Sequence, residues 1–176
     1  MKKFLLSFLL CLILPFTAEA EGVSQPETLA KEAVIVDFET GAVLYDKNAD
    51  IKTPTSSMSK VMTAMVVFDA IRSGKLSLEQ TLPVSEKAWR SEGSKMFVAL
   101  NSQVKVEDLI RGMIIQSGND ACVVLAEGVA GSEENFTELL NAKAKEIGLT
   151  GSHFMNSSGW PDPEHYSTVR DLAAMA

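Results

Sequence analysis

The sequence predicts a mixed α+β (α/β) domain, in which an N-terminal β-hairpin is followed by a helical region. Residues 32–50 show strand-like alternation, and from Met58 onward apolar residues recur at three- and four-residue steps. Gly and Pro separate these segments. With 176 residues, 46% of them hydrophobic, the chain is long enough for one domain with a substantial core.

The first twenty residues predict a secretory signal peptide. Two lysines precede an apolar run over 4–16 that is short for a membrane span, and Ala18 and Ala20 place small residues at a cleavage site. Cleavage after Ala20 would leave residues 21–176 as the domain and direct it to the periplasm. An uncleaved N-terminal anchor is the alternative.

The charge and the cysteines of the mature region exclude several classes of protein. Cleavage removes a net charge of +1, so the formal charge of −7 becomes −8, which argues against a nucleic-acid partner. Cys122 would be the one cysteine left, so no internal disulfide is expected, and its apolar surroundings predict a buried, inert thiol. His153 and His165 lack metal-ligand spacing and are expected at the surface. We expect neither a metal nor a cofactor.

Residues 32–50 predict the hairpin. Val34, Val36 and Phe38 alternate with their neighbours, and Thr40-Gly41 supplies the turn before a returning strand.

A helix is predicted from Met58 until Gly74 ends it. Its apolar residues are expected to form one buried stripe: Met58, Val61, Met62, Met65, Phe68 and Ile71. Residues 75–105 show little regular pattern beyond a short helix after Ser85.

Four later helices are predicted from apolar spacing and end signals. They cover about 106–115, from about Asp120 to Gly128 or Gly131, from the cap Ser132 to Gly148, and from the cap Thr168, with Asp171 completing a capping box. The last helix reaches Ala176 without a terminator, and a lone hairpin lacks partner strands. We therefore expect an incomplete domain; a frayed helix on a complete domain is the alternative.

Two Ser-x-x-Lys pairs occur, and their contexts differ. Ser102 and Lys105 lie in a polar segment where both side chains can face water. Ser57 instead comes just before the apolar helix, where free backbone N–H groups favour a developing oxyanion, and Lys60 follows one turn later on the same face. Burial could lower the pKa of that lysine enough for it to act as a base. The alternative is that these serines only cap the helix.

A second polar motif, QSGND at 116–120, interrupts two apolar helices. A polar loop among apolar helices is costly unless its groups are used. Ser117 and Asn119 would add a proton relay and an amide-holding group to Ser57 and Lys60, which together form the set that a serine–lysine acyl-transfer site needs.

These motifs together resemble the low-molecular-mass penicillin-binding proteins, the serine D-Ala-D-Ala carboxypeptidases. The resemblance extends over nearly the whole mature region, in the segments VDFETGAVLYDKNAD, PTSSMSKVMT, GSKMFV, DLIRGMIIQSGNDACVVLAEGVAGS and NSSGWPDPEHYSTVRDLAAMA. Ser-Gly-Asn in place of Ser-Asp-Asn favours carboxypeptidases over class A β-lactamases.

The resemblance implies a penicillin-binding-protein/β-lactamase-like transpeptidase fold, with Ser57 as the acylated nucleophile and Lys60 as its base. It implies that Ser117 relays a proton to the leaving D-alanine and that Asn119 holds the substrate amide. The implied partners are peptidoglycan stem peptides and β-lactam antibiotics.

The sequence departs from the family's pattern because a Lys-Thr-Gly motif is absent; Lys52-Thr53 is followed by proline. In the family that motif comes later, so here it would lie beyond residue 176, as would the C-terminal segment through which such proteins associate with the membrane surface. Three alternatives remain: a β-lactamase, for which the loop offers Glu164, a D-amino-acid esterase, and an inactive truncated product. Trp160 is expected to serve packing.

Overall fold

The computed structural model describes residues 26–176; the predicted signal peptide at 1–20 lies outside them. Within the described part the elements, in chain order, are β1 (Ala33–Val36), β2 (Val43–Lys47), the 3₁₀ helix η1 (Ser56–Met58), α1 (Ser59–Arg72), β3 (Thr81–Pro83), α2 (Glu86–Trp89), β4 (Gln103–Lys105), α3 (Val106–Gln116), α4 (Asn119–Ala130), α5 (Glu133–Glu146) and α6 (Val169–Met175).

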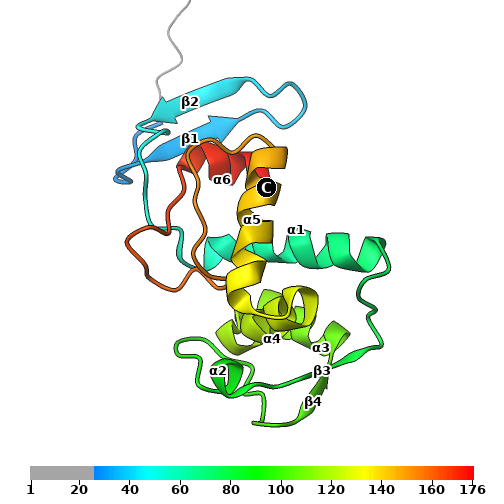
Figure 1. Ribbon diagram of the computed structural model, residues 1–176. Coiled ribbons are helices and arrows are strands. Elements are labelled where there is room, and N and C mark those ends of the chain that lie inside the picture. Colours follow the sequence, from blue (N-terminus) through cyan, green and yellow to red (C-terminus); the bar gives the residue numbers. More distant parts are fainter. Residues whose placement is uncertain (1–25) are drawn as a thin grey trace, which may run out of the picture.

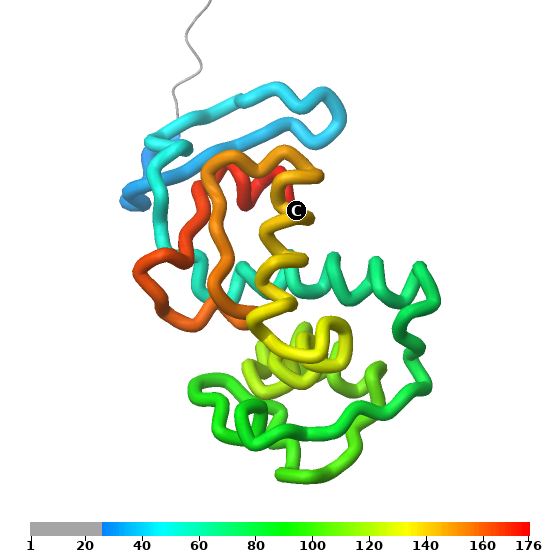
Figure 2. Tube along the Cα trace, in the orientation of Figure 1, coloured from blue at the N-terminus to red at the C-terminus, as the bar shows by residue number. Residues whose placement is uncertain are grey.

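The elements form two regions joined by α1 and α5 (Figure 1). The β1–β2 hairpin lies at one end of the molecule with α6 against β1, and α2, α3, α4 and the β3–β4 pair lie at the other end. The Cα trace shows α5 running from α4 to the hairpin end, and α1 crossing beside it (Figure 2). The expected mixture of a hairpin and a helical region is confirmed.

The hairpin forms where the sequence predicts it. Its strands pair antiparallel from Ala33 opposite Lys47 to Val36 opposite Val43, with an irregularity in register after Ile35. Gly41 takes the left-handed conformation that the turn requires, with φ of 71°. Apolar side chains of the hairpin remain open to solvent, among them Phe38 at 96% and Leu44 at 62% exposed.

Helix α1 has the predicted length, but its buried face differs from the predicted stripe. Met62 is fully buried, whereas Met58, Val61 and Phe68 are exposed. The residues that face inward include Ser59, Lys60, Thr63, Val66, Val67 and Ala70. The apolar residues of α1 are distributed around most of its circumference, so periodicity alone does not show which face is buried. The neighbours of α1 select it: α4, α5 and the loop before α6, whose carbonyls accept hydrogen bonds from α1 side chains.

Helix α4 is the centre of the helical region. It contacts α1, α2, α3, α5 and β3, and nine of its twelve residues are buried. The predicted N-caps of α5 and α6 are confirmed: the Ser132 hydroxyl accepts from the Asn135 amide, and the Thr168 hydroxyl accepts from the Asp171 amide. The predicted capping box is not completed, because the Asp171 carboxylate accepts from Gly151 N–H and the Ser152 hydroxyl instead.

The antiparallel pair β3–β4 has no counterpart in the sequence-based prediction. Each strand has only three residues, which is too short for an alternation pattern to show. Both strands belong to the segment between α1 and α3, and β3 packs on α4.

Candidate active site

Ser57 lies in the 3₁₀ turn that leads into α1, and its side chain meets Lys60. The Lys60 Nζ atom donates to Ser57 Oγ at 3.0 Å. Neither η1 nor α1 has a side-chain cap at its N-terminus, so the helix-capping interpretation of Ser57 is wrong. The turn is strained just before Ser57, because Ser56 adopts a φ of 48°.

Lys60 is buried on the inward face of α1, with 7% of its surface exposed. Its Nζ also donates to the carbonyl oxygen of Ser158 at 2.8 Å. None of the ion pairs within residues 26–176 involves Lys60. Burial therefore lowers the pKa of this amine from its usual value, the direction that a general base requires.

In the second Ser-x-x-Lys pair the pKa of the lysine is shifted in the opposite direction. The Lys105 ammonium forms an ion pair with Glu107 at 3.1 Å, and this contact raises the pKa of Lys105. The hydroxyl of Ser102 donates to the carbonyl of Ala99 at 2.7 Å rather than meeting the lysine. Lys105 is thus held in its charged form, and the prediction that this pair is only a polar surface segment agrees with its contacts.

Ser117 terminates α3 in a left-handed conformation, with φ of 56° and ψ of 36°. Its Oγ atom is buried and has no hydrogen-bond partner, the one such side-chain atom among the described residues. A buried hydroxyl without a partner costs stability, and such groups call for an explanation in function or in bound solvent. The structure does not join Ser117 to Ser57 or Lys60 by a hydrogen bond.

Asn119 begins α4 and faces the same pocket as Ser57. Its Nδ2 atom donates to the carbonyl of Glu92 at 2.7 Å, and its backbone N–H donates to the carbonyl of Ser94 at 2.7 Å. The amide orientation is therefore fixed, and the Oδ1 atom has no recorded partner in the part of the chain that the structure describes. Ser57 and Asn119 line one pocket of about 240 Å³, together with residues of the 93–94 and 158–161 segments.

The next residue, Asp120, holds the 94–98 segment against α4. Its Oδ1 accepts from the Met96 amide at 3.0 Å, and its Oδ2 accepts from the Val98 amide at 3.2 Å. Asp120 is fully buried. Sequence reasoning used Asp120 only as the start of a helix; the signal for its second role is an acidic residue at the N-terminus of an otherwise apolar helix.

The 156–160 loop supplies the other wall, and sequence reasoning missed its role. Asn156 Oδ1 accepts from the backbone amides of Ser158, Gly159 and Trp160 at 3.2, 2.8 and 2.9 Å. This tight loop directs the Ser158 carbonyl to Lys60. Trp160, expected to serve packing, is 45% exposed and lines the pocket of Ser57.

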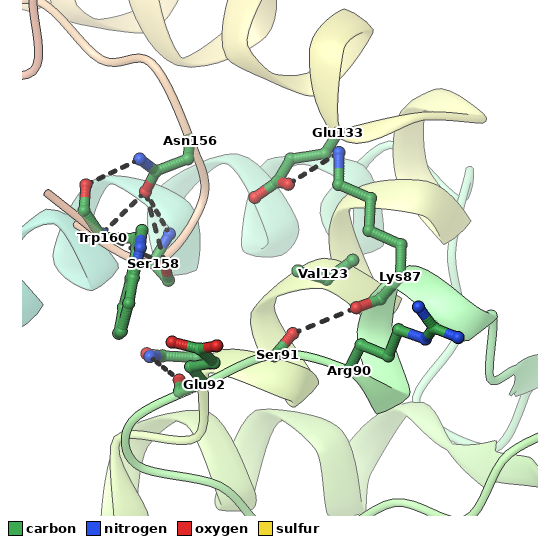
Figure 3. A pocket seen from close by; sticks show the side chains of 10 residues that line it. Lys87, Arg90, Ser91, Glu92, Val123, Glu133, Asn156, Ser158 and Trp160 are labelled. Atoms are coloured by element: carbon green, nitrogen blue, oxygen red, sulfur yellow. Dashed lines mark hydrogen bonds and ion pairs between the residues drawn. The ribbon is translucent and has the colours of Figure 1, made fainter. Parts of the chain in front are cut away.

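A second pocket, of about 250 Å³, adjoins the first and shares Asn119, Ser158 and Trp160 with it (Figure 3). On its far side Lys87 lies between the carboxylates of Glu133 and Glu134, at 3.0 and 2.7 Å. The two pockets therefore lie side by side, and Asn119, Ser158 and Trp160 form the wall between them.

The expectation that both histidines lie at the surface is wrong for His165, which is 5% exposed. Its Nε2 atom lies 2.7 Å from Ser59 Oγ, behind the turn that carries Ser57. His153 is partly buried and lies 2.7 Å, through Nδ1, from the carbonyl of Glu164. Hydrogen bonding to a distant helix leaves no periodic signal in the sequence, so the position of His165 could not be predicted.

Cys122 is buried on α4, as predicted, and burial raises the pKa of its thiol to about 12. No group of three or more His, Cys, Asp or Glu residues in the described part of the chain could hold a metal ion. Nor is any helix between residues 26 and 176 both long and apolar enough to cross a membrane.

Comparison with known proteins identifies relatives of the chain. The chain is 40% identical over 147 residues to the D-alanyl-D-alanine carboxypeptidase DacF of Bacillus subtilis, and this match covers 84% of the chain but 38% of the relative. Penicillin binding protein 5 of Haemophilus influenzae superimposes with a TM-score of 0.84 at 39% identity, over 88% of this chain and 46% of that one.

A third structure was solved with a ligand. Penicillin-binding protein D2 of Listeria monocytogenes, in its ampicillin-bound form, superimposes with a TM-score of 0.75 at 29% identity, over 86% of this chain and 62% of that one. The sequence profile of the D-alanyl-D-alanine carboxypeptidases matches residues 19–176. The chain spans about two fifths of the length of the curated relatives it matches, and it belongs to the D-alanyl-D-alanine carboxypeptidase family.

Proposed function

We propose that the protein is a serine D-Ala-D-Ala carboxypeptidase, which removes the terminal D-alanine from peptidoglycan stem peptides through an acyl-Ser57 intermediate. The observation that carries the proposal is the 3.0 Å contact between Ser57 Oγ and the buried amine of Lys60, which has no carboxylate partner among the described residues. An exposed hydroxyl beside a lysine of lowered pKa is an activated nucleophile.

In the first step, neutral Lys60 takes the proton of Ser57 while Oγ attacks the carbonyl carbon between the two D-alanines. The Ser158 carbonyl binds one N–H of the amine, which leaves the nitrogen lone pair free to face the Ser57 hydroxyl. The negative charge that develops on the substrate oxygen lies at the start of a helix, where backbone N–H groups favour it.

In the second step, the carbon–nitrogen bond breaks, and the leaving D-alanine takes a proton that passes from Lys60 through Ser117. The unpartnered Oγ of Ser117 can both accept and donate, as a relay must. Asn119 Oδ1 accepts an amide N–H of the peptide, because the bond from Nδ2 to the Glu92 carbonyl fixes the orientation of the side-chain amide. Water then hydrolyses the acyl-enzyme and regenerates Ser57.

The same chemistry makes β-lactams the second class of ligand, since their strained amide can acylate Ser57. The ampicillin-bound relative supports this partner. A class A β-lactamase would need a carboxylate to activate the deacylating water. Glu164 is exposed and does not line the pocket of Ser57, so the structure does not favour that alternative.

The proposed compartment is the periplasm, after cleavage behind Ala20, because stem peptides lie outside the cytoplasmic membrane. N-terminal sequencing of the protein recovered from a periplasmic extract tests this: the mature chain should begin at Glu21. An intact N-terminus in the membrane fraction would indicate an anchor instead.

Fluorescent penicillin tests the nucleophile in the full-length gene product. Ser57→Ala should abolish covalent labelling, whereas Ser102→Ala, in the other Ser-x-x-Lys pair, should leave it intact. Release of D-alanine from a diacetyl-Lys-D-Ala-D-Ala peptide should follow the same pattern. Labelling that survives Ser57→Ala would refute the assignment, and a parent protein that takes no label would refute the proposed activity.

A further inference from the structure

Behind the nucleophile turn lies a chain of three buried polar side chains that the proposed reaction does not use. Thr55, Ser59 and His165 are 1%, 0% and 5% exposed. Ser59 Oγ lies 2.7 Å from His165 Nε2 and 2.5 Å from Thr55 Oγ1. Thr55 comes two residues before Ser57 and Ser59 two residues after it. The chain therefore fixes both ends of the turn that carries the nucleophile.

The contacts of His165 fix which of its ring nitrogens carries the proton. The Met155 amide donates to His165 Nδ1 at 3.2 Å, so Nδ1 is an acceptor and the ring proton is on Nε2. Nε2–H then donates to Ser59 Oγ, which shares a second hydrogen bond with Thr55 Oγ1 in which either hydroxyl can be the donor. The imidazole thus fixes the position of the Ser59 hydroxyl, and through it that of Thr55.

His165 is itself held by contacts outside the turn. Its backbone N–H donates to the carbonyl of Asp162 at 3.0 Å, and its ring packs edge to face on Phe154 with centroids 5.6 Å apart. Thr53 and Ser167 exchange two backbone hydrogen bonds, of 2.8 and 3.1 Å, beside it. The position of the imidazole is therefore fixed independently of the strained turn at Ser56 and Ser57, and the imidazole can hold that turn in place.

We propose that His165 is a positioning residue for the Ser57–Lys60 pair. Through Ser59 and Thr55 it sets the turn so that Ser57 Oγ meets Lys60 Nζ at 3.0 Å. It touches neither of these two side chains by a recorded hydrogen bond, and its effect is on geometry alone. The inference rests on the proposed function, since it assigns His165 a part in acylation of Ser57.

Two amide substitutions separate this role from a general structural one. In His165→Gln, the amide N–H can occupy the place of Nε2 and donate to Ser59. In His165→Asn, the shorter side chain reaches only the place of Nδ1 and leaves Ser59 without its donor. We expect the acylation rate by fluorescent penicillin to stay near the parent's for Gln, and to fall about 10²-fold for Asn, as expected for misplaced reacting atoms.

Asn141→Leu is the control for loop stability. Asn141 Nδ2 donates to the Phe154 carbonyl at 2.8 Å, and its Oδ1 accepts from the Phe154 amide at 2.9 Å. Its loss should lower the thermal midpoint by loosening the segment next to His165 while leaving Thr55 and Ser59 in place. Below that midpoint the acylation rate should remain near the parent's.

Three outcomes would overturn the proposal. The first is a His165→Asn protein that acylates as fast as the parent, and the second is an Asn141→Leu protein slowed as much as His165→Asn. The third is independent of activity: a crystal structure of His165→Asn that keeps the 3.0 Å contact between Ser57 and Lys60. If the parent takes no penicillin, the proposed function fails, and this structural comparison alone decides the role of His165.

Discussion

Gly159 packs directly against the backbone carbonyl of Ser56. A Cβ atom at position 159 would fall 1.8 Å from that oxygen, and Gly159 also has a left-handed φ of 80°. The residue before it, Ser158, supplies the carbonyl that binds Lys60, and the residue after Ser56 is the proposed nucleophile, Ser57. The loop that binds Lys60 and the turn that carries Ser57 are therefore in direct contact.

Gly159→Ala should impair both folding and acylation. The left-handed backbone costs an alanine about 1 kcal/mol, and the clash with Ser56 adds overpacking of about 1–3 kcal/mol. Because the clash must move either Ser56 or the 158–159 loop, the penicillin acylation rate should also fall. Thermal unfolding and labelling kinetics measure the two effects.

Gly148→Ala is the matched control for Gly159→Ala. Gly148 has a φ of 82°, but nothing lies within 4 Å of an added Cβ. This variant should lose only the stability that the left-handed backbone costs an alanine, and it should keep the parent's acylation rate. Equal behaviour of the two variants would show that the contact with Ser56 does not matter.

Lys60→Arg should stop acylation although the positive charge is retained. Arginine keeps its proton at any accessible pH, so it cannot take the proton of Ser57. Lys105→Arg, at the ion-paired lysine, is the control and should label normally. If Lys60→Arg kept its acylation rate within about tenfold of the parent, a difference of about 1.4 kcal/mol, Lys60 would serve only as a charge.

The acylation rate should rise with pH and then reach a plateau. The midpoint of this rise should lie below 10.5, the usual pKa of a lysine. Burial lowers the pKa of Lys60, so its reactive neutral form accumulates at lower pH than for an exposed lysine. The same shift predicts that the free energy of unfolding rises with pH between the lowered pKa of Lys60 in the folded state and 10.5, its usual value. In this range the unfolded chain binds the proton and the folded chain has released it.

Penicillin labelling rates measured as a function of pH check the first statement, and thermal midpoints of the parent and Lys60→Met over the same range check the second. In Lys60→Met the rise in stability with pH should be reduced. A rate that falls as the pH increases through this range would contradict the role of Lys60 as a base.

Much of the fold could be predicted because its signals are local. Gly41 marks the hairpin turn, and the hydroxyls of Ser132 and Thr168 cap α5 and α6 where the spacing predicts. The pairing of Ser57 with Lys60 is local too, since three residues of helix bring them together.

The rest depends on contacts between distant segments. The carbonyl of Ser158 lies 98 residues from Lys60, and His165 lies 106 residues from Ser59. Backbone carbonyls and single polar side chains carry no periodic pattern, so their partners are set only when the helices pack. The exposed Phe68 shows the same limit: an apolar residue at helical spacing is buried only if a neighbour covers it.

Ser117→Ala should stabilise the protein and slow its reaction. The buried Ser117 hydroxyl has no partner, and removing such a group relieves a cost of about 1–3 kcal/mol. Alanine and serine pay a similar cost for the left-handed backbone at this position, so that term nearly cancels. Loss of the proton relay should slow D-alanine release about 10²-fold or more.

Ser102→Ala is the counterpart of Ser117→Ala, because the Ser102 hydroxyl already donates to the carbonyl of Ala99. It should lose a little stability and keep full turnover. Calorimetry and D-alanine release from the diacetyl-Lys-D-Ala-D-Ala peptide measure both properties. A gain in stability paired with a loss of turnover, seen for Ser117→Ala alone, is the signature of a hydroxyl kept for the reaction. Lower stability with unchanged turnover would instead make Ser117 a structural residue.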